Sequence, residues 1–166
     1  MNISIRRILL PTDFSQPAKE AQQYAMALAD RLGAELHLLH VAPIVMPYAD
    51  ASSSWIMPEN VMQEQIEAAD EHLGREVDAE WAARHHVKHT AVAGFAVDEI
   101  LKYATEQQID LIVVGTHGRS GLSHFVIGSV AEKLVRMANC PVLTVHPQGH
   151  QFLIDTAAAQ SAQMTV

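Results

Sequence analysis

Several features are scarce in this chain of 166 residues, and each scarcity excludes a class of protein. The single cysteine, Cys140, excludes an intrachain disulfide and suits a reducing compartment. No apolar run approaches the ~20 residues of a membrane-spanning helix. The apolar stretch after Arg7 stops at Pro11, which makes it too short for a signal peptide. We therefore expect a cytoplasmic protein that does not insert into membranes.

Positive charge is scarce as well. The chain has 11 Lys and Arg residues against 19 Asp and Glu residues, a formal net charge of −8, and no long basic run. Nucleic acid is an improbable partner for such a surface. An anionic ligand would have to be held by local backbone N–H groups and not by a general positive field. The 49% apolar and 18% charged residues are typical of one soluble globular domain.

The order of the predicted elements indicates the fold class. Ser15 and Gly33 bound the first predicted helix as N-cap and C-terminal glycine. Three further helices are expected at 59–84, 97–107 and 129–138, and a proline- and serine-rich loop at 42–58. Nearly continuous apolar runs predict strands at 3–10, 35–41, 87–93, 110–114 and 141–145. Alternating strands and helices with such runs predict a doubly wound parallel α/β sheet with helices on both faces.

A glycine-rich segment joins the fourth predicted strand to the last predicted helix. It runs from Gly115 to Ser129, and Ser129-Val-Ala-Glu132 has the spacing of a capping box at a helix start. Glycines let the backbone approach a ligand closely, and the free N–H groups of a helix N-terminus point at it. The segment therefore predicts a cradle for an anion, and phosphate is the expected one.

The spacing of this segment resembles that of a known family. Gly115 and Gly118, then nine residues, then Gly128 and Ser129 resemble the ATP-binding signature of the universal stress protein family. The opening 7–15 and the closing 141–145 are also similar to the family pattern, and the resemblance covers roughly 5–147. It implies one Rossmann-like domain over 1–147 with five strands in the order 3-2-1-4-5. The tail 148–166 lies beyond the pattern and is expected to be a short helix or disordered.

The resemblance also implies a ligand and its binding residues. In that strand order the winding reverses between the first and fourth strands, which is where such sheets bind ligands. The implied ligand is ATP with Mg²⁺, its adenine between Asp13 and Val41 and its phosphates along the glycine-rich segment. The predicted nucleotide-binding residues are Pro11, Thr12, Asp13, Val41, Gly115, Gly118, Arg119, Gly128, Ser129 and Val130. The simpler alternatives are that Asp13 is a turn residue, that the glycines only satisfy turn geometry, and that Arg119 is solvated.

Three functions remain open. The favoured one, which the resemblance implies, is a nucleotide-dependent regulator in the stress response that acts on an unidentified partner. The resemblance also implies a homodimer through the last strand, where Val142, Leu143 and Val145 would form a sheet edge that needs covering. The second is a slow ATP hydrolase or phosphotransferase using His117, His124 or Arg119, although the chain has no Gly-Lys-[Ser/Thr] phosphate loop. The third is a dimeric interaction protein that binds no nucleotide. A metal site at His85, His86 and His89 is not expected, because their side chains should diverge.

Overall fold

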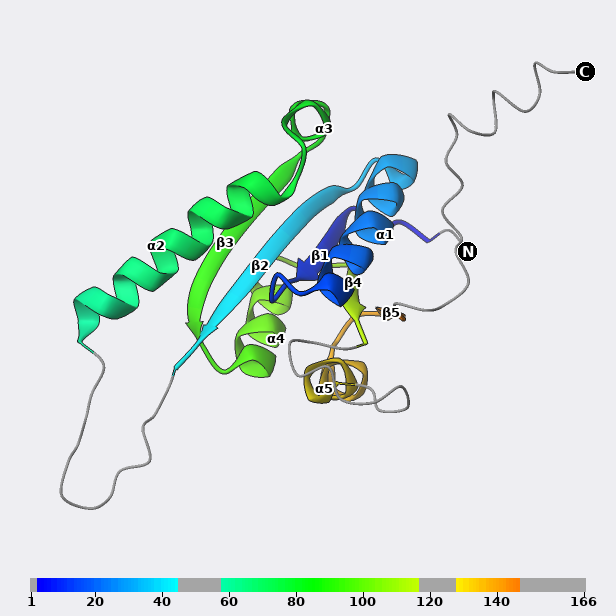
Figure 1. Cartoon of the computed structure of the whole chain (residues 1–166). Helices are drawn as coiled ribbons and strands as arrows, with labels where there is room; N and C mark the ends of the chain where they lie inside the picture. Colours follow the sequence, from blue (N-terminus) through cyan, green and yellow to red (C-terminus); the bar gives the residue numbers. More distant parts are fainter. Residues whose placement is uncertain (1–2, 45–57, 117–127, 147–166) are drawn as a thin grey trace, which may run out of the picture.

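Five parallel strands form the centre of the molecule (Figure 1). The structure is a computed structural model and describes residues 3–44, 58–116 and 128–146. The strands lie in the order β3-β2-β1-β4-β5, which confirms the predicted order. Their bounds are β1 (Arg7–Pro11), β2 (Glu35–Pro43), β3 (Val87–Gly94), β4 (Leu111–Gly115) and β5 (Val142–Val145).

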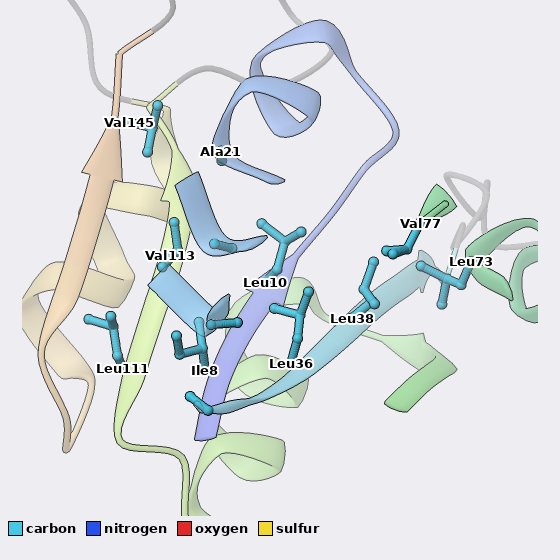
Figure 2. Close-up of a cluster of buried hydrophobic side chains, with 13 residues drawn as sticks. Ile8, Leu10, Ala21, Leu36, Leu38, Leu73, Val77, Leu111, Val113 and Val145 are labelled. Carbon is cyan, nitrogen blue, oxygen red and sulfur yellow. The ribbon is translucent and has the colours of Figure 1, made fainter. Parts of the chain in front are cut away.

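Helices cover both faces of the sheet, as the doubly wound fold requires. The helices are α1 (Gln16–Leu32), α2 (Glu59–Glu76), α3 (Ala79–Arg84), α4 (Ala96–Glu106) and α5 (Ser129–Met137). One apolar cluster packs α1 and the end of α2 on β1, β2 and β4, and Figure 2 shows its side chains, Leu10 and Leu38 among them. A second cluster packs α4 and α5 on the opposite face, around Leu9 and Ile112.

Helix α1 begins and ends where the sequence predicts. The Ser15 side chain accepts a hydrogen bond from the Ala18 N–H, and Gly33 ends the helix in the left-handed conformation with φ of 62°. A glycine takes that conformation without steric cost. Four buried alanines, at 18, 21, 25 and 29, face the sheet. Their small side chains let the helix lie close to β1 and β4.

The prediction of a single helix over 59–84 is wrong. The chain forms α2 and α3 instead, with a break at Val77 and Asp78. Val77 is extended and buries its side chain in the core, while Asp78 caps α3 by accepting hydrogen bonds from the N–H groups of Glu80 and Trp81, both at 3.0 Å. The spacing of the apolar residues does not reveal the break, because Val77 would be buried both in one continuous helix and in two helices. The capping role of Asp78 was the available signal for the break.

Other boundaries differ by a few residues. Strand β1 begins at Arg7 and not at residue 3, and β2 continues to Pro43, inside the predicted loop 42–58. Residues 45–57 of that loop and the predicted tail 148–166 lie outside the described residues. No helix in the described ranges is long and apolar enough to cross a membrane.

Candidate functional site

A pocket of about 340 Å³ opens at the carboxyl ends of β1 and β4, where the winding of the sheet reverses. Ligands bind at such a switch point in open α/β sheets. The sequence predicted ten binding residues, and the structure brings eight of them together in the pocket lining: Pro11, Thr12, Asp13, Val41, Gly115, Gly128, Ser129 and Val130. The other two, Gly118 and Arg119, lie outside the described residues, as do His117 and His124.

The wall after β1 is a tight turn. Thr12 donates its backbone N–H to the Leu39 carbonyl at 2.9 Å, which extends the pairing of β1 with β2 beyond the strand. Asp13 accepts the Ser15 N–H on Oδ1 at 3.1 Å and also lines the pocket. The turn role and the place in the pocket wall are therefore compatible, because a carboxylate can accept several hydrogen bonds.

The opposite wall is the start of α5, and here the predicted capping box is wrong. Gly128 and not Ser129 is the N-cap residue, and its carbonyl accepts the Glu132 N–H at 3.0 Å. The Gly128 N–H donates to the Thr116 carbonyl at 2.6 Å. No described side chain caps this helix, and Ser129, Val130 and Ala131 of its first turn line the pocket. The unpaired N–H groups of a helix start favour an anion.

Gly115 has a packing reason to be glycine. A Cβ added there would lie 2.8 Å from the Pro17 carbonyl oxygen and 3.0 Å from the Pro17 carbonyl carbon, both in the first turn of α1. Gly128, in contrast, has φ of −56° and ψ of 143°, a backbone that any residue adopts. A conformational need for glycine therefore does not explain Gly128, whereas close packing explains Gly115.

We expect Gly115→Ala to destabilise the protein by about 1–3 kcal/mol, because the methyl group would push α1 away from β4. Gly74→Ala in α2 is the matched control. Its Cβ would lie 3.6 Å from the His89 ring, an ordinary contact, and alanine favours a helix interior over glycine by about 1 kcal/mol. Urea unfolding measures both free energies. A Gly115→Ala protein as stable as the wild type would contradict the packing argument.

Comparison with known proteins decides the family. The model of the Universal stress protein family matches residues 4–146. The chain belongs to this family. A universal stress protein of Methanocaldococcus jannaschii is 32% identical over 142 residues, which cover 84% of this chain and 81% of that protein. The resemblance seen in the glycine spacing and in the opening strand thus extends over nearly the whole described chain.

Solved universal stress proteins share the fold. The protein from Lactobacillus plantarum aligns with a TM-score of 0.71 at 26% identity, covering 87% of this chain and 99% of that one. A universal stress protein in complex with cAMP aligns with a TM-score of 0.63 at 23% identity, covering 88% of this chain and 100% of that one. The second likeness concerns the fold alone, and both support the Rossmann-like architecture.

Sequence reasoning missed part of the pocket of this universal stress protein. The missed residues are small or apolar and lie on strands β2 and β4 or near the starts of α1, α4 and α5: Ala18, Leu39, Ala96, Ile100, Val114 and Ala131. The predicted topology could have identified these residues, because in a parallel sheet the start of α4 lies at the same end of the strands as the starts of α1 and α5. Their side chains make the inner surface of the pocket largely apolar.

His85 and His89 of this universal stress protein pair with carboxylates on two different helices. His85 pairs with Asp30 of α1 at 3.0 Å, and His89 pairs with Asp70 of α2 at 3.1 Å. Within 3–44, 58–116 and 128–146, no group of three or more His, Cys, Asp or Glu side chains is placed to hold a metal ion. These histidines join helices to one another and to the sheet.

A buried histidine lies at the other end of the sheet from the pocket. His37 of β2 is fully buried, and its Nδ1 lies 3.0 Å from the Tyr103 hydroxyl of α4. Its Nε2 is 3.4 Å from Glu35 Oε2 and makes no hydrogen bond to a described residue. Burial lowers the pKa of His37, and the Glu35 carboxylate opposes that effect. The Lys88 ammonium, 2.8 Å from Glu35, lowers the pKa of that carboxyl group.

The lowered pKa of His37 predicts a loss of stability in mild acid. As the pH falls below about 6.5, His37 takes up a proton in the unfolded chain before it does so in the folded one. Protonation therefore stabilises the unfolded state relative to the folded state, and the free energy of unfolding falls. We expect His37→Gln, which keeps a polar side chain near Tyr103 but cannot titrate, to flatten this dependence. Urea unfolding of both proteins at pH 7 and pH 5.5 tests it. Equal losses in the two proteins would contradict the expectation.

Proposed function

We propose that this universal stress protein binds ATP with Mg²⁺ in the pocket between β1 and β4 and acts as a nucleotide-dependent regulatory module in the stress response. One observation carries the proposal: Asp13 and the described ends of the glycine-rich segment, Gly115 on one side and Gly128 with Ser129 on the other, line one pocket. Small-molecule sites typically combine apolar walls with a few polar groups at fixed positions, and this pocket has that character.

The proposed binding position of the phosphates is the N-terminus of α5. Both α4 and α5 begin at the pocket, and no described side chain caps either helix. Helix α4 has two carboxylates in its first turn, Asp98 and Glu99, which offset its positive end. Helix α5 has one, Glu132, which lies 3.5 Å from Arg136. The N–H groups at 129–131 are therefore the better anion site, which agrees with the glycine spacing before them.

The base belongs at the other end, against β1 and β2. Val41 and Leu39 offer apolar surface to a flat ring, and Asp13 offers a carboxylate to a ribose hydroxyl or an amino group. Asp13 is also the one carboxylate among the described pocket-lining residues. Mg²⁺ commonly combines one or two carboxylates with the phosphates of its nucleotide. The ion would accordingly arrive with ATP and be held chiefly through the phosphates.

Calorimetry at matched Mg²⁺ tests the nucleotide site. We expect heat of binding with ATP and weaker binding of GTP, because guanine presents a carbonyl where adenine presents an amino group to Asp13. Absence of heat with ATP, or equal affinity for GTP, would refute the proposal. Identification of the small molecules released on denaturing the purified protein provides an independent check.

We propose that the protein senses ATP by binding it and does not hydrolyse it at the rate of an ordinary enzyme. Fast phosphoryl transfer needs charge neutralisation at the γ-phosphate and a positioned nucleophile. The described pocket lining contains backbone N–H groups, one carboxylate, and no lysine or arginine. Such a set complements the ground state of the ligand without favouring the transition state. Turnover should lie well below the ~1 s⁻¹ at the low end of ordinary enzymes. Turnover of several per second would move the protein into the hydrolase class.

The proposed module is a homodimer through β5. This strand is an edge of the sheet, and its unpaired backbone groups can pair with a second copy. Leu143 is 37% exposed, Val142 is half-buried, and Val145 packs into the chain's own core. Leu143 is therefore the side chain of this strand that is best placed for a contact between copies.

We expect Leu143→Lys to convert the dimer to a monomer, because a charge would be buried in the interface. Leu32→Lys is the matched control, since Leu32 is 46% exposed at the end of α1 and should tolerate the charge. Analytical ultracentrifugation at micromolar concentration measures the oligomeric state. A wild type that sediments as a monomer would refute the interface.

A further inference from the structure

Three aromatic rings stack beside the pocket. Phe14, the residue after Asp13, lies between His40 of β2 and His72 of α2. The Phe14 and His40 ring centroids are 4.5 Å apart with an interplanar angle of 27°, and the Phe14 and His72 centroids are 4.1 Å apart with an angle of 4°. Stacked rings at such distances stabilise a structure by roughly 0.5–1.5 kcal/mol beyond their buried area. The stack links a helix to the loop that forms one wall of the pocket.

The backbone of Phe14 needs this support. Its φ is 63°, in the left-handed region that a bulky residue rarely adopts because it is sterically strained. Two hydrogen bonds shape the turn around it: the Phe14 N–H donates to Thr12 Oγ1 at 3.1 Å, and the Ser15 N–H donates to Asp13 Oδ1 at 3.1 Å. Local bonds of this kind persist in a strained conformation only when the surroundings also favour it. The two histidine rings, together with the core against which Phe14 packs, are those surroundings.

His40 joins the stack to the pocket wall. Its Nδ1 lies 2.8 Å from the Thr12 carbonyl oxygen, and because a carbonyl only accepts, the proton is on Nδ1. Thr12 is thus held on both sides by β2, through its N–H on the Leu39 carbonyl and through its own carbonyl on His40. His40 is buried and belongs to the sheet, so it provides the fixed inner ring of the stack.

His72 provides the outer ring, from a different element. Its side chain is 55% exposed, and its Nε2 lies 3.1 Å from Glu76 Oε1. Gln22 of α1 donates from Nε2 to the Glu76 carbonyl at 2.7 Å, which ties the end of α2 to α1. His72 therefore contacts the pocket loop from a helix that contributes no residue to the pocket lining in the described chain.

We propose that Phe14 is a positioning residue for nucleotide binding, and that its stack with His40 and His72 holds Thr12 and Asp13 in the pocket wall. Helix α2 then influences nucleotide affinity without touching the nucleotide. This inference rests on the nucleotide site proposed above. The stack biases the loop toward its binding-competent conformation, and apparent affinity falls with the fraction of molecules in that conformation.

Three substitutions on or beside α2 distinguish this positioning role from a general effect of disturbing the contacts of α2. His72→Ala removes the outer ring, and the loss of a stack of that strength weakens ATP binding by roughly two- to tenfold. His72→Phe keeps a ring against Phe14 but loses the Glu76 contact, and restores the affinity. His89→Ala is the matched control, because His89 also joins α2 to the sheet through a carboxylate, Asp70, and is 40% exposed. It leaves the affinity unchanged.

Two readouts are needed, and they are independent. Calorimetry with ATP and Mg²⁺ measures affinity. Hydrogen exchange of the Phe14 and Ser15 amides, measured without nucleotide, reports the loop itself, and exchange quickens in His72→Ala by a similar factor. Wild-type affinity in His72→Ala, or an equal loss in His89→Ala, overturns the positioning role. A wild type that binds no ATP refutes the proposed function instead, and unchanged amide exchange in His72→Ala then overturns the stack as a support of the loop.

Discussion

Gly128→Val should abolish measurable ATP binding while the fold survives. Gly128 lines the pocket beside the N–H groups at the start of α5, so a branched side chain there would block the approach of the phosphates. Hydrogen bonds to a charged group contribute about 1.5–3 kcal/mol each, so the loss of two weakens binding by roughly a hundredfold or more. Calorimetry with ATP and Mg²⁺ measures this loss.

The fold should survive because the backbone of Gly128 suits valine. Its φ of −56° and ψ of 143° are open to any residue, and its N–H would keep the bond to the Thr116 carbonyl. An unchanged circular dichroism spectrum and thermal midpoint would establish this. Gly74→Ala is the control, because it alters a glycine on α2 away from the pocket lining. Wild-type affinity in a folded Gly128→Val protein would show that the phosphates lie elsewhere.

Leu10→Ala should cause the largest loss of stability. Leu10 is fully buried in the central strand β1, opposite Leu38 in the register with β2, and it packs beneath α1 (Figure 2). Removing a leucine side chain from such a site costs about 2–5 kcal/mol, since transfer energy is lost and a cavity remains. Urea unfolding measures it.

Leu32→Ala is the control for that loss. Leu32 is 46% exposed, so the same change should alter the free energy of unfolding by no more than about 0.5 kcal/mol. A loss below 1 kcal/mol in Leu10→Ala would mean that the core relaxes around this residue.

The fold and one wall of the site follow from local patterns. Apolar runs bounded by turn residues predict the strands, and Ser15 and Gly33 predict the ends of α1, because these signals act over a few neighbouring residues. The glycine spacing from Gly115 to Ser129 predicts the pocket from chemistry that one segment carries. Strand order was accessible because it follows from the family resemblance, and the structure confirms it.

The errors arose where a neighbour from elsewhere in the chain decides the outcome. Ser129 has the spacing of a capping residue, but the Thr116 carbonyl takes the Gly128 N–H, Gly128 is the N-cap, and the helix starts one residue earlier than the capping box implies. The helix over 59–84 breaks at Val77 and Asp78, where Gln22 of α1 donates to the Glu76 carbonyl and Asp78 caps α3. Gly115 is explained by Pro17, which contacts it across the fold and not along the chain.

The sequence by itself determined the fold class and, through the family resemblance, the position of the pocket at the switch point of the sheet, while phosphate binding at the start of α5 stays a prediction. Each of these depends on residue types at short spacings. Tertiary structure alone decided the apolar lining of the pocket, the hydrogen bonds that hold Thr12 from β2, and the stack of Phe14 between His40 and His72. These features join residues from separate elements, and no local preference encodes such a contact, since it exists only once the sheet and its helices have packed together.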